Sequence, residues 1–151
     1  MKGFGSMEEI LSFAIAREEE AAAFYRDLSS RMEWPWMTKT FEQFAREEDG
    51  HKAKLLGIKS GKRPIPASAK IADLKIGDYL VEVDPIGKLD YQEALIVAMK
   101  REKASFRLYT VLADVVDNPA HRDLFSILAQ EEAKHKLRFE LEYDEHILKE
   151  N

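Results

Sequence analysis

Residues 44–51 read FAREEDGH, and residues 128–135 read LAQEEAKH, 84 positions further along the chain. Each stretch holds a glutamate and a histidine three residues apart, namely Glu48 with His51 and Glu132 with His135. Residues three apart lie on the same side of an α-helix, so each pair can present both side chains to one point. The recurrence predicts a duplicated helical unit.

The similarity between the two halves extends well beyond these stretches. When residues 9–55 are paired with residues 93–139, 14 of the 47 pairs are identical and no gap is needed. The identical pairs include Arg17 with Arg101, Glu18 with Glu102, Tyr25 with Tyr109, Phe41 with Phe125 and Ala45 with Ala129. A repeated helical hairpin cannot bury its apolar side alone, so the two copies are expected to pack into a four-helix bundle.

Apolar periodicity and capping signals place the four helices. They are expected over residues 6–31, 35–56, 90–116 and 119–148, with Gly57 ending the second. Ser6 to Glu9 and Asp90 to Glu93 have capping-box spacing, and Asn118-Pro119 favours a helix start. In the second helix we expect five residues to point inward: Phe41, Phe44, Ala45, Leu55 and Leu56.

The segment between the hairpins, residues 57–89, is rich in glycine and proline and is expected to be a crossover, with one short helix near residues 71–80. Hairpins related by a two-fold axis across the bundle require the second and third helices to run parallel. The crossover must therefore travel the length of the bundle.

Composition limits the class of protein. The 151 residues, 45% of them hydrophobic, suit a single domain, and the absence of cysteine excludes thiol catalysis, zinc-thiolate sites and iron–sulfur clusters within them. The net charge of −5 argues against nucleic acid or an anionic membrane as partner. No signal peptide or membrane-spanning stretch is found, so a cytoplasmic location is expected.

The two Glu-x-x-His motifs follow the apolar stripes, as do Glu18 and Glu102, so each helix is expected to turn one carboxylate inward. For either motif alone, a solvated helix surface is the commoner explanation. Four unpaired buried carboxylates would be strongly destabilising, whereas two divalent cations would balance their charge. We therefore expect a two-metal centre bound by Glu18, Glu48, His51, Glu102, Glu132 and His135.

This pattern resembles the ferritin-like di-iron carboxylate family, in which two helices each supply a Glu and two each supply Glu-x-x-His. More narrowly, the sequence is similar to the rubrerythrin branch. The resembling segments are residues 14–18 with Phe24-Tyr25, residues 44–48 with His51, Arg101-Glu102 with Leu108-Tyr109, and residues 128–132 with His135. The resemblance implies an all-α, ferritin-like four-helix bundle.

By the same resemblance, Glu18 and Glu102 would be terminal ligands, the catalytic Glu48 and Glu132 would bridge two irons, and each histidine would bind one iron. The implied activity is reduction of hydrogen peroxide or dioxygen by a di-iron oxidoreductase. The alternative is iron handling, in which a ferroxidase site oxidises or buffers iron without turning over another substrate. Manganese or zinc remains open in place of iron.

The chain departs from the branch at several points. Ser105 stands where a typical rubrerythrin has a further ligand glutamate, and no rubredoxin domain lies within the 151 residues, so an external electron donor such as a rubredoxin-like protein is expected. Asp49 stands where bacterioferritins have their haem-binding methionine, so no haem is expected. No fifth helix follows the fourth, which favours a homodimer over a 24-subunit cage.

Four further residues are candidates for supporting roles. Tyr25 and Tyr109 each follow an expected ligand by seven residues. They either hydrogen-bond carboxylates outside the ligand set, relay electrons, or are core tyrosines whose hydroxyls find a hydrogen-bond partner. Glu47 and Glu131 precede the expected bridging glutamates and either orient an imidazole of the other hairpin or lie on solvated surface.

Overall fold

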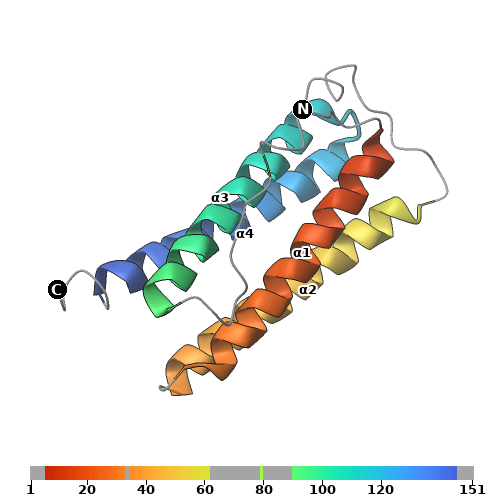
Figure 1. The fold of residues 1–151 in the computed structure, drawn as a ribbon. Coiled ribbons are helices and arrows are strands. Elements are labelled where there is room, and N and C mark those ends of the chain that lie inside the picture. Colours follow the sequence, from red (N-terminus) through yellow and green to blue (C-terminus); the bar gives the residue numbers. More distant parts are fainter. Residues whose placement is uncertain (1–5, 33–34, 62–78, 80–89, 146–151) are drawn as a thin grey trace.

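The computed structural model describes residues 6–32, 35–61, 79 and 90–145, which form four long helices and no strand (Figure 1). The helices are α1 (Met7–Ser30), α2 (Pro35–Lys59), α3 (Tyr91–Val115) and α4 (Pro119–Tyr143). The four predicted helices are therefore confirmed. The short helix predicted near residues 71–80 and the predicted end of the fourth helix lie outside the described residues, apart from residue 79.

Three helices begin at the side chains predicted to cap them. Ser6 accepts a hydrogen bond from the backbone N–H of Glu9 at 3.1 Å, and Asp90 accepts one from that of Glu93 at 2.7 Å. Asn118 accepts from two backbone N–H groups in the first turn of α4. These caps satisfy N–H groups that have no partner within the helix.

The predicted end of α2 at Gly57 is wrong, because the helix continues to Lys59. No glycine among the described residues has a positive φ, so Gly57 keeps helical backbone and does not form a left-handed cap. The helix closes instead through hydrogen bonds from the N–H of Ser60 to the carbonyl of Leu56 and from that of Gly61 to Ile58.

The helices form two antiparallel hairpins that lie against each other (Figure 1). Helix α1 packs along α2 and α3 along α4, whereas the backbones of different hairpins approach closely at few points. Helices α2 and α3 run parallel, so α2 ends and α3 begins at opposite ends of the bundle. The predicted direction of the helices is confirmed, and the two hairpins meet mainly through side chains.

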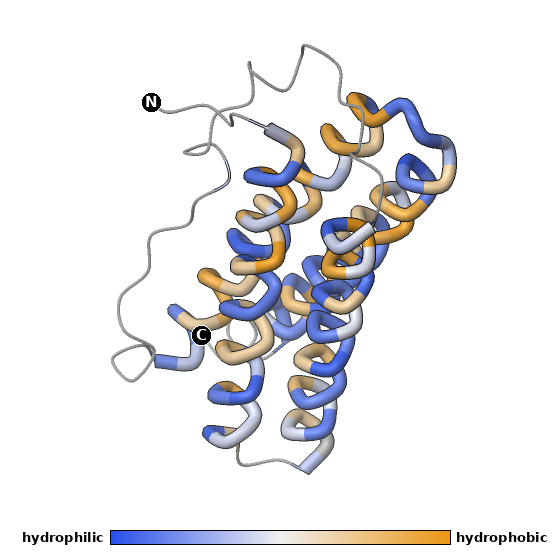
Figure 2. The backbone as a smooth tube through the Cα atoms, turned by 90° about the vertical axis from the view of Figure 1, so that its right-hand side faces the viewer, coloured by the Kyte–Doolittle hydropathy of each residue, from blue (hydrophilic) through white to orange (hydrophobic). Residues whose placement is uncertain are grey.

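Hydrophobic and hydrophilic residues alternate along every helix (Figure 2), and the buried apolar residues form two clusters. One cluster includes Ile10 and Leu112, and the other includes Leu28 and Phe41. The prediction that Leu56 points inward is wrong, since this side chain is 42% exposed. Adjacent helical residues point about 100° apart, so Leu55 and Leu56 cannot both face the core.

Candidate metal centre

A layer of buried ionisable side chains separates the two apolar clusters. It consists of the six predicted ligands, each at most 4% exposed: Glu18, Glu48, His51, Glu102, Glu132 and His135. In α1, for example, Glu18 lies between Ala14 of one cluster and Ala21 of the other. The structure therefore brings all six predicted residues together, with at least one from every helix.

The six residues form two overlapping groups of four. Glu18, Glu48, His51 and Glu132 make one group, and Glu48, Glu102, Glu132 and His135 make the other. Within each group, one ligand atom from every residue lies within 4.8 Å of the rest. Because Glu48 and Glu132 belong to both groups, they stand where carboxylates that contact two ions would stand.

Every member of the layer has a buried polar atom that makes no hydrogen bond. These atoms are one carboxylate oxygen of each of the four glutamates and Nδ1 of both histidines. Buried polar groups without a partner are rare and destabilising, and here they are concentrated at one place. Carboxylates and imidazoles together suit divalent iron, manganese or zinc, so the residues present fit a pair of such ions.

Two close approaches between imidazole and carboxylate inside the layer also suit shared coordination. His51 Nδ1 lies 2.7 Å from Glu132 Oε1, and His135 Nδ1 lies 2.9 Å from Glu48 Oε1, yet neither nitrogen meets the angles of a hydrogen bond. Each of these contacts joins an imidazole nitrogen of one hairpin to a carboxylate oxygen of the other, and neither atom of either pair has a hydrogen-bond partner.

Burial and mutual repulsion change the proton affinity of this layer. Burial, followed by repulsion from Glu102 and Glu18, raises the pKa of Glu48 well above its usual value of 4.5. Burial and repulsion from Glu102 and Glu48 do the same to the pKa of Glu132. Without a cation, the layer therefore retains protons that a metal ion would displace.

Burial acts on the pKa of the histidines in the opposite direction, but neighbouring carboxylates reverse the outcome. Burial alone lowers the pKa of His135, but the neighbouring carboxylates of Glu102 and Glu48 outweigh it and raise the pKa to about 11. The pKa of His51 is also raised, by Glu18 and Glu131, against the effect of burial. In the metal-free protein both imidazoles therefore hold the proton of their charged form more tightly than an ordinary histidine does.

The outer nitrogens of both rings contact glutamates of the opposite hairpin. His135 Nε2 lies 2.5 Å from Glu47 Oε2, and His51 Nε2 makes the equivalent contact with Glu131. Of the two alternatives left open by the sequence, the structure matches orientation of an imidazole across the hairpins. Such a partner fixes the ring and leaves Nδ1 facing the layer.

The two tyrosines link the hairpins in a reciprocal way. The Tyr25 hydroxyl of α1 donates to Glu102 of α3, and the Tyr109 hydroxyl of α3 donates to Glu18 of α1. Burial and the nearby carboxylates raise the pKa of both hydroxyls well above 10, so they remain donors. Of the alternatives that the sequence left open, the structure matches buried core tyrosines whose hydroxyls find a partner, and these partners are the expected ligands Glu102 and Glu18 and not carboxylates further out.

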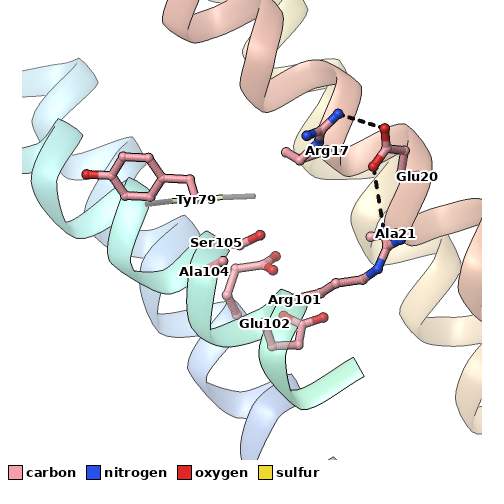
Figure 3. Close-up of a pocket in the computed structure, with 9 residues that line it drawn as sticks. Arg17, Glu20, Ala21, Tyr79, Arg101, Glu102, Ala104 and Ser105 are labelled. Atoms are coloured by element: carbon pink, nitrogen blue, oxygen red, sulfur yellow. Dashed lines mark hydrogen bonds and ion pairs between the residues drawn. The ribbon is translucent and has the colours of Figure 1, made fainter. Parts of the chain in front are cut away.

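A small cavity of about 30 Å³ opens between α1 and α3 and reaches Glu102 and Glu132 (Figure 3). Two arginines and one glutamate also line it: Arg17 donates to Glu20 at 2.7 Å, and Arg101 Nη1 lies 3.7 Å from the other oxygen of Glu20. We did not predict a role for these arginines. Their identity in the two halves of the sequence is the signal that could have identified them.

The duplication is broken at this cavity. Glu20 is matched in the second half by Ala104, and Ala21 is matched by Ser105, and all four residues line the cavity. The six expected ligands are thus symmetric, whereas the opening that reaches them is not.

Comparisons with known proteins agree with this geometry. The sequence model of the rubrerythrin family matches residues 9–143. A solved structure from Thermotoga maritima, described as a ferritin-like diiron-carboxylate protein, is 25% identical with a TM-score of 0.75, and the match covers 97% of this chain and 98% of that one.

A second solved structure, a hypothetical protein from Pyrococcus furiosus, shares the fold at 24% identity with a TM-score of 0.71, over 93% of this chain and 89% of that one. No curated protein matches the chain significantly. In the described part of the chain, no helix has an apolar stretch long enough to cross a bilayer.

The predicted all-α, ferritin-like bundle is therefore confirmed, together with a candidate carboxylate and histidine metal site inside it. Because the family match spans all four helices, we conclude that the chain belongs to the rubrerythrin family.

Proposed function

We propose that this protein is a non-haem di-iron oxidoreductase that reduces hydrogen peroxide or dioxygen. The observation that carries the proposal is the convergence of four buried carboxylates and two imidazoles whose inward atoms lack hydrogen-bond partners. When bound, a pair of Fe(II) ions supplies two electrons, so that hydrogen peroxide and two protons become two water molecules.

The geometry supports a division of roles among the six residues. Glu48 and Glu132, which belong to both groups, would bind both ions. Glu18 with His51 would complete one position, and Glu102 with His135 the other. Tyr25 and Tyr109 would hold the two terminal carboxylates, and Glu47 and Glu131 would hold the two rings, so that the ligands keep their orientation.

The size of the α1/α3 cavity supports a small oxidant as substrate. A water molecule needs about 10 to 15 Å³, so a cavity of about 30 Å³ has room for two water-sized groups. Dioxygen or hydrogen peroxide fits such a space. The guanidinium groups of Arg17 and Arg101 can donate hydrogen bonds to a polar oxidant.

The test begins with anaerobic loading of the protein with Fe(II) and measurement of the bound iron. We expect two irons per chain, near-ultraviolet absorption of an oxo-bridged pair after oxidation, and consumption of one hydrogen peroxide for each pair oxidised. Repeated consumption in the presence of a chemical reductant would support turnover. Continued uptake of iron beyond two per chain, or oxidation that cannot be repeated, would instead favour iron handling.

The matched control is the double variant Glu48→Ala, Glu132→Ala. We expect it to stay helical by circular dichroism but to lose both bound irons, because each change removes a ligand from both groups. If the wild-type protein binds no more iron than this variant, the proposal is falsified. Parallel loading with Mn(II) and Zn(II) identifies the metal that the site retains best.

A further inference from the structure

The two arginines that line the α1/α3 cavity have a positive charge that is only half balanced. Among the described residues, Glu20 is the one carboxylate that forms an ion pair with either Arg17 or Arg101. The other two carboxylates of this cavity, Glu102 and Glu132, belong to the buried layer, where two metal ions would balance their charge. The outer part of the cavity therefore carries two positive charges and one negative charge.

The hydrogen bonds of these arginines are also incomplete. Arg17 donates one, from Nη2 to Glu20 Oε1 at 2.7 Å. Arg101 donates none to the described residues, and its Nη1 lies 3.7 Å from Glu20 Oε2, beyond hydrogen-bonding distance. Nε of each arginine is buried and has no partner. Because a guanidinium group has five N–H donors, both groups can donate to a further acceptor.

Aromatic rings hold the two guanidinium groups in place. Cζ of Arg17 lies 4.7 Å from the centroid of the Phe13 ring, and Cζ of Arg101 lies 5.2 Å from that of Phe24. The two side chains are only 26% and 16% exposed. Contact with a ring fixes the orientation of a guanidinium group, and partial burial strengthens its attraction for an anion.

Glu20 indicates what kind of ligand these arginines can hold. Its carboxylate lies between the two guanidinium groups, with one oxygen towards each (Figure 3). The side chain is 49% exposed, and an ion pair at such a position is weak. The second half of the sequence has Ala104 at the matching position. The carboxylate can therefore turn into solvent, and another planar group with two oxygens can take its place.

We propose that Arg17 and Arg101 bind a small planar oxyanion of the formate, bicarbonate or nitrate type, at the position of the Glu20 carboxylate. The anion would accept hydrogen bonds from guanidinium groups of both hairpins. Guanidinium groups favour such ligands, because their parallel N–H donors match two oxygens in one plane. The inference goes beyond the proposed function, since this binding needs neither an oxidant nor electron transfer.

The first test observes the arginine side chains directly. Full-length, ¹⁵N-labelled protein loaded with diamagnetic Zn(II) is titrated with sodium formate. The Nε–H signals are assigned with the single variants Arg17→Gln and Arg101→Gln. We expect both signals to shift together and to reach saturation. Sodium chloride should shift them much less, because a spherical ion does not present two oxygens in one plane. An equal shift with chloride, or no saturation, would overturn the proposal.

Calorimetric titration of variants with formate provides the second test. Arg17→Gln, Arg101→Gln should weaken formate binding by about tenfold or more, because hydrogen bonds to a charged group are lost. The matched control, Arg46→Gln, Arg107→Gln, removes the same charge at exposed positions of α2 and α3 and should change the affinity by less than about twofold. Unchanged affinity in the first variant would place formate elsewhere, for example on the metal ions, and would contradict the proposal.

Glu20→Ala should have the opposite effect, because it removes the group that competes with formate. We expect binding to become tighter by about threefold or more. The control is Glu19→Ala, which removes the same charge from the same helix, where Glu19 pairs with Lys52 at 2.8 Å. It should leave the affinity nearly unchanged. Equal effects of the two variants, or no effect of Glu20→Ala, would show that formate and Glu20 do not share a position. This variant keeps both arginines, so it provides a test even if their replacement prevents folding.

Metal content keeps this proposal separate from the proposed function. All variants should bind as much Zn(II) as the wild type and should remain helical by circular dichroism. If formate binds as expected but the iron-loaded protein does not react with peroxide, the proposed function is wrong and the anion site stands. If peroxide oxidises the iron-loaded protein but formate shifts neither arginine signal, the anion site is wrong and the proposed function stands.

Discussion

The carboxylates of Glu48 and Glu132 are held at the position in the bundle where ionisation is least favourable. They are each 1% exposed, and in the metal-free protein burial and mutual repulsion raise their pKa values. A group with a higher pKa in the folded than in the unfolded state binds protons more tightly when folded. Its contribution to stability is complete below the unfolded pKa and is lost as pH rises.

Metal-free protein should therefore lose stability as pH rises above about 4.5, the usual value for glutamate. The raised pKa values of His51 and His135 act in the same direction at higher pH. The control is Glu48→Gln, Glu132→Gln, which keeps the shape of both side chains without the charge. Urea unfolding across this range should show the wild type becoming less stable relative to the control; a constant difference would contradict the assignment.

The hydroxyls of Tyr25 and Tyr109 should matter for both stability and metal retention. Replacing either tyrosine with phenylalanine leaves a buried oxygen of Glu102 or Glu18 without its donor. Loss of a hydrogen bond to a charged group costs about 1.5 to 3 kcal/mol, and loss of a residue that orients a ligand weakens metal binding about 10- to 100-fold. Urea unfolding and competition with a chelator measure the two effects.

Tyr143→Phe is the matched control for these variants. Its hydroxyl accepts a hydrogen bond from Gln92 at 3.0 Å, in an exposed interaction outside the buried layer. We expect it to lower the free energy of unfolding by less than about 1 kcal/mol and to leave metal binding unchanged. Equal losses in all three variants would show that the layer does not depend on Tyr25 and Tyr109 as described.

At the scale of single elements, α2 carries two glycines inside the helix. Gly50 and Gly57 have helical backbone, and a methyl group at either position would meet no atom within 4 Å. Alanine should therefore stabilise the protein by about 0.5 to 1 kcal/mol at each site, since it loses less backbone entropy on folding. Thermal and urea unfolding measure the gain.

Gly61→Ala provides the comparison for this element. It lies beyond the end of α2, and its added Cβ would be 3.2 Å from the carbonyl oxygen of Ile58. We expect no gain in the free energy of unfolding there. A gain equal to that of Gly50→Ala would indicate that helix propensity is not the cause.

The helices were largely predictable from sequence because their signals are local. Capping side chains and apolar spacing depend on residues within one turn, so Ser6, Asp90 and Asn118 marked three helix starts correctly. The end of α2 was not predictable from Gly57, because glycine permits a left-handed cap without requiring one. Leu56 was misplaced because two adjacent apolar residues do not reveal which one faces the core.

The sequence predicted which residues form the candidate site, but it did not predict which neighbouring side chains contact them. The duplicated spacing identified all six converging residues, since a repeat preserves which side of each helix faces inward. The partners of Tyr25 and Tyr109, and the role of Arg17 and Arg101 at the α1/α3 cavity, depend on the relative rotation and distance of the two hairpins. Those quantities are properties of packing and have no local pattern in the sequence.

For the whole molecule, the buried layer predicts that stability depends on metal. The hairpins share few close backbone approaches, and the six converging residues lie between them. Metal at about 100 times its dissociation constant should stabilise the fold by about 2.7 kcal/mol for each independent site. Thermal unfolding under anaerobic conditions, with Fe(II) or with a chelator, should show this difference in wild type and none in Glu48→Gln, Glu132→Gln.

The even division of the donors between the hairpins has a consequence for assembly. Glu18, Glu48 and His51 belong to the first hairpin, and their counterparts belong to the second, so neither hairpin holds a full set. A protein of half the length, with only one hairpin, could assemble the same centre only by pairing with a second copy of itself. Within one chain the two halves need not match at every position, and beside the α1/α3 opening they do not, since Glu20 and Ala21 correspond to Ala104 and Ser105.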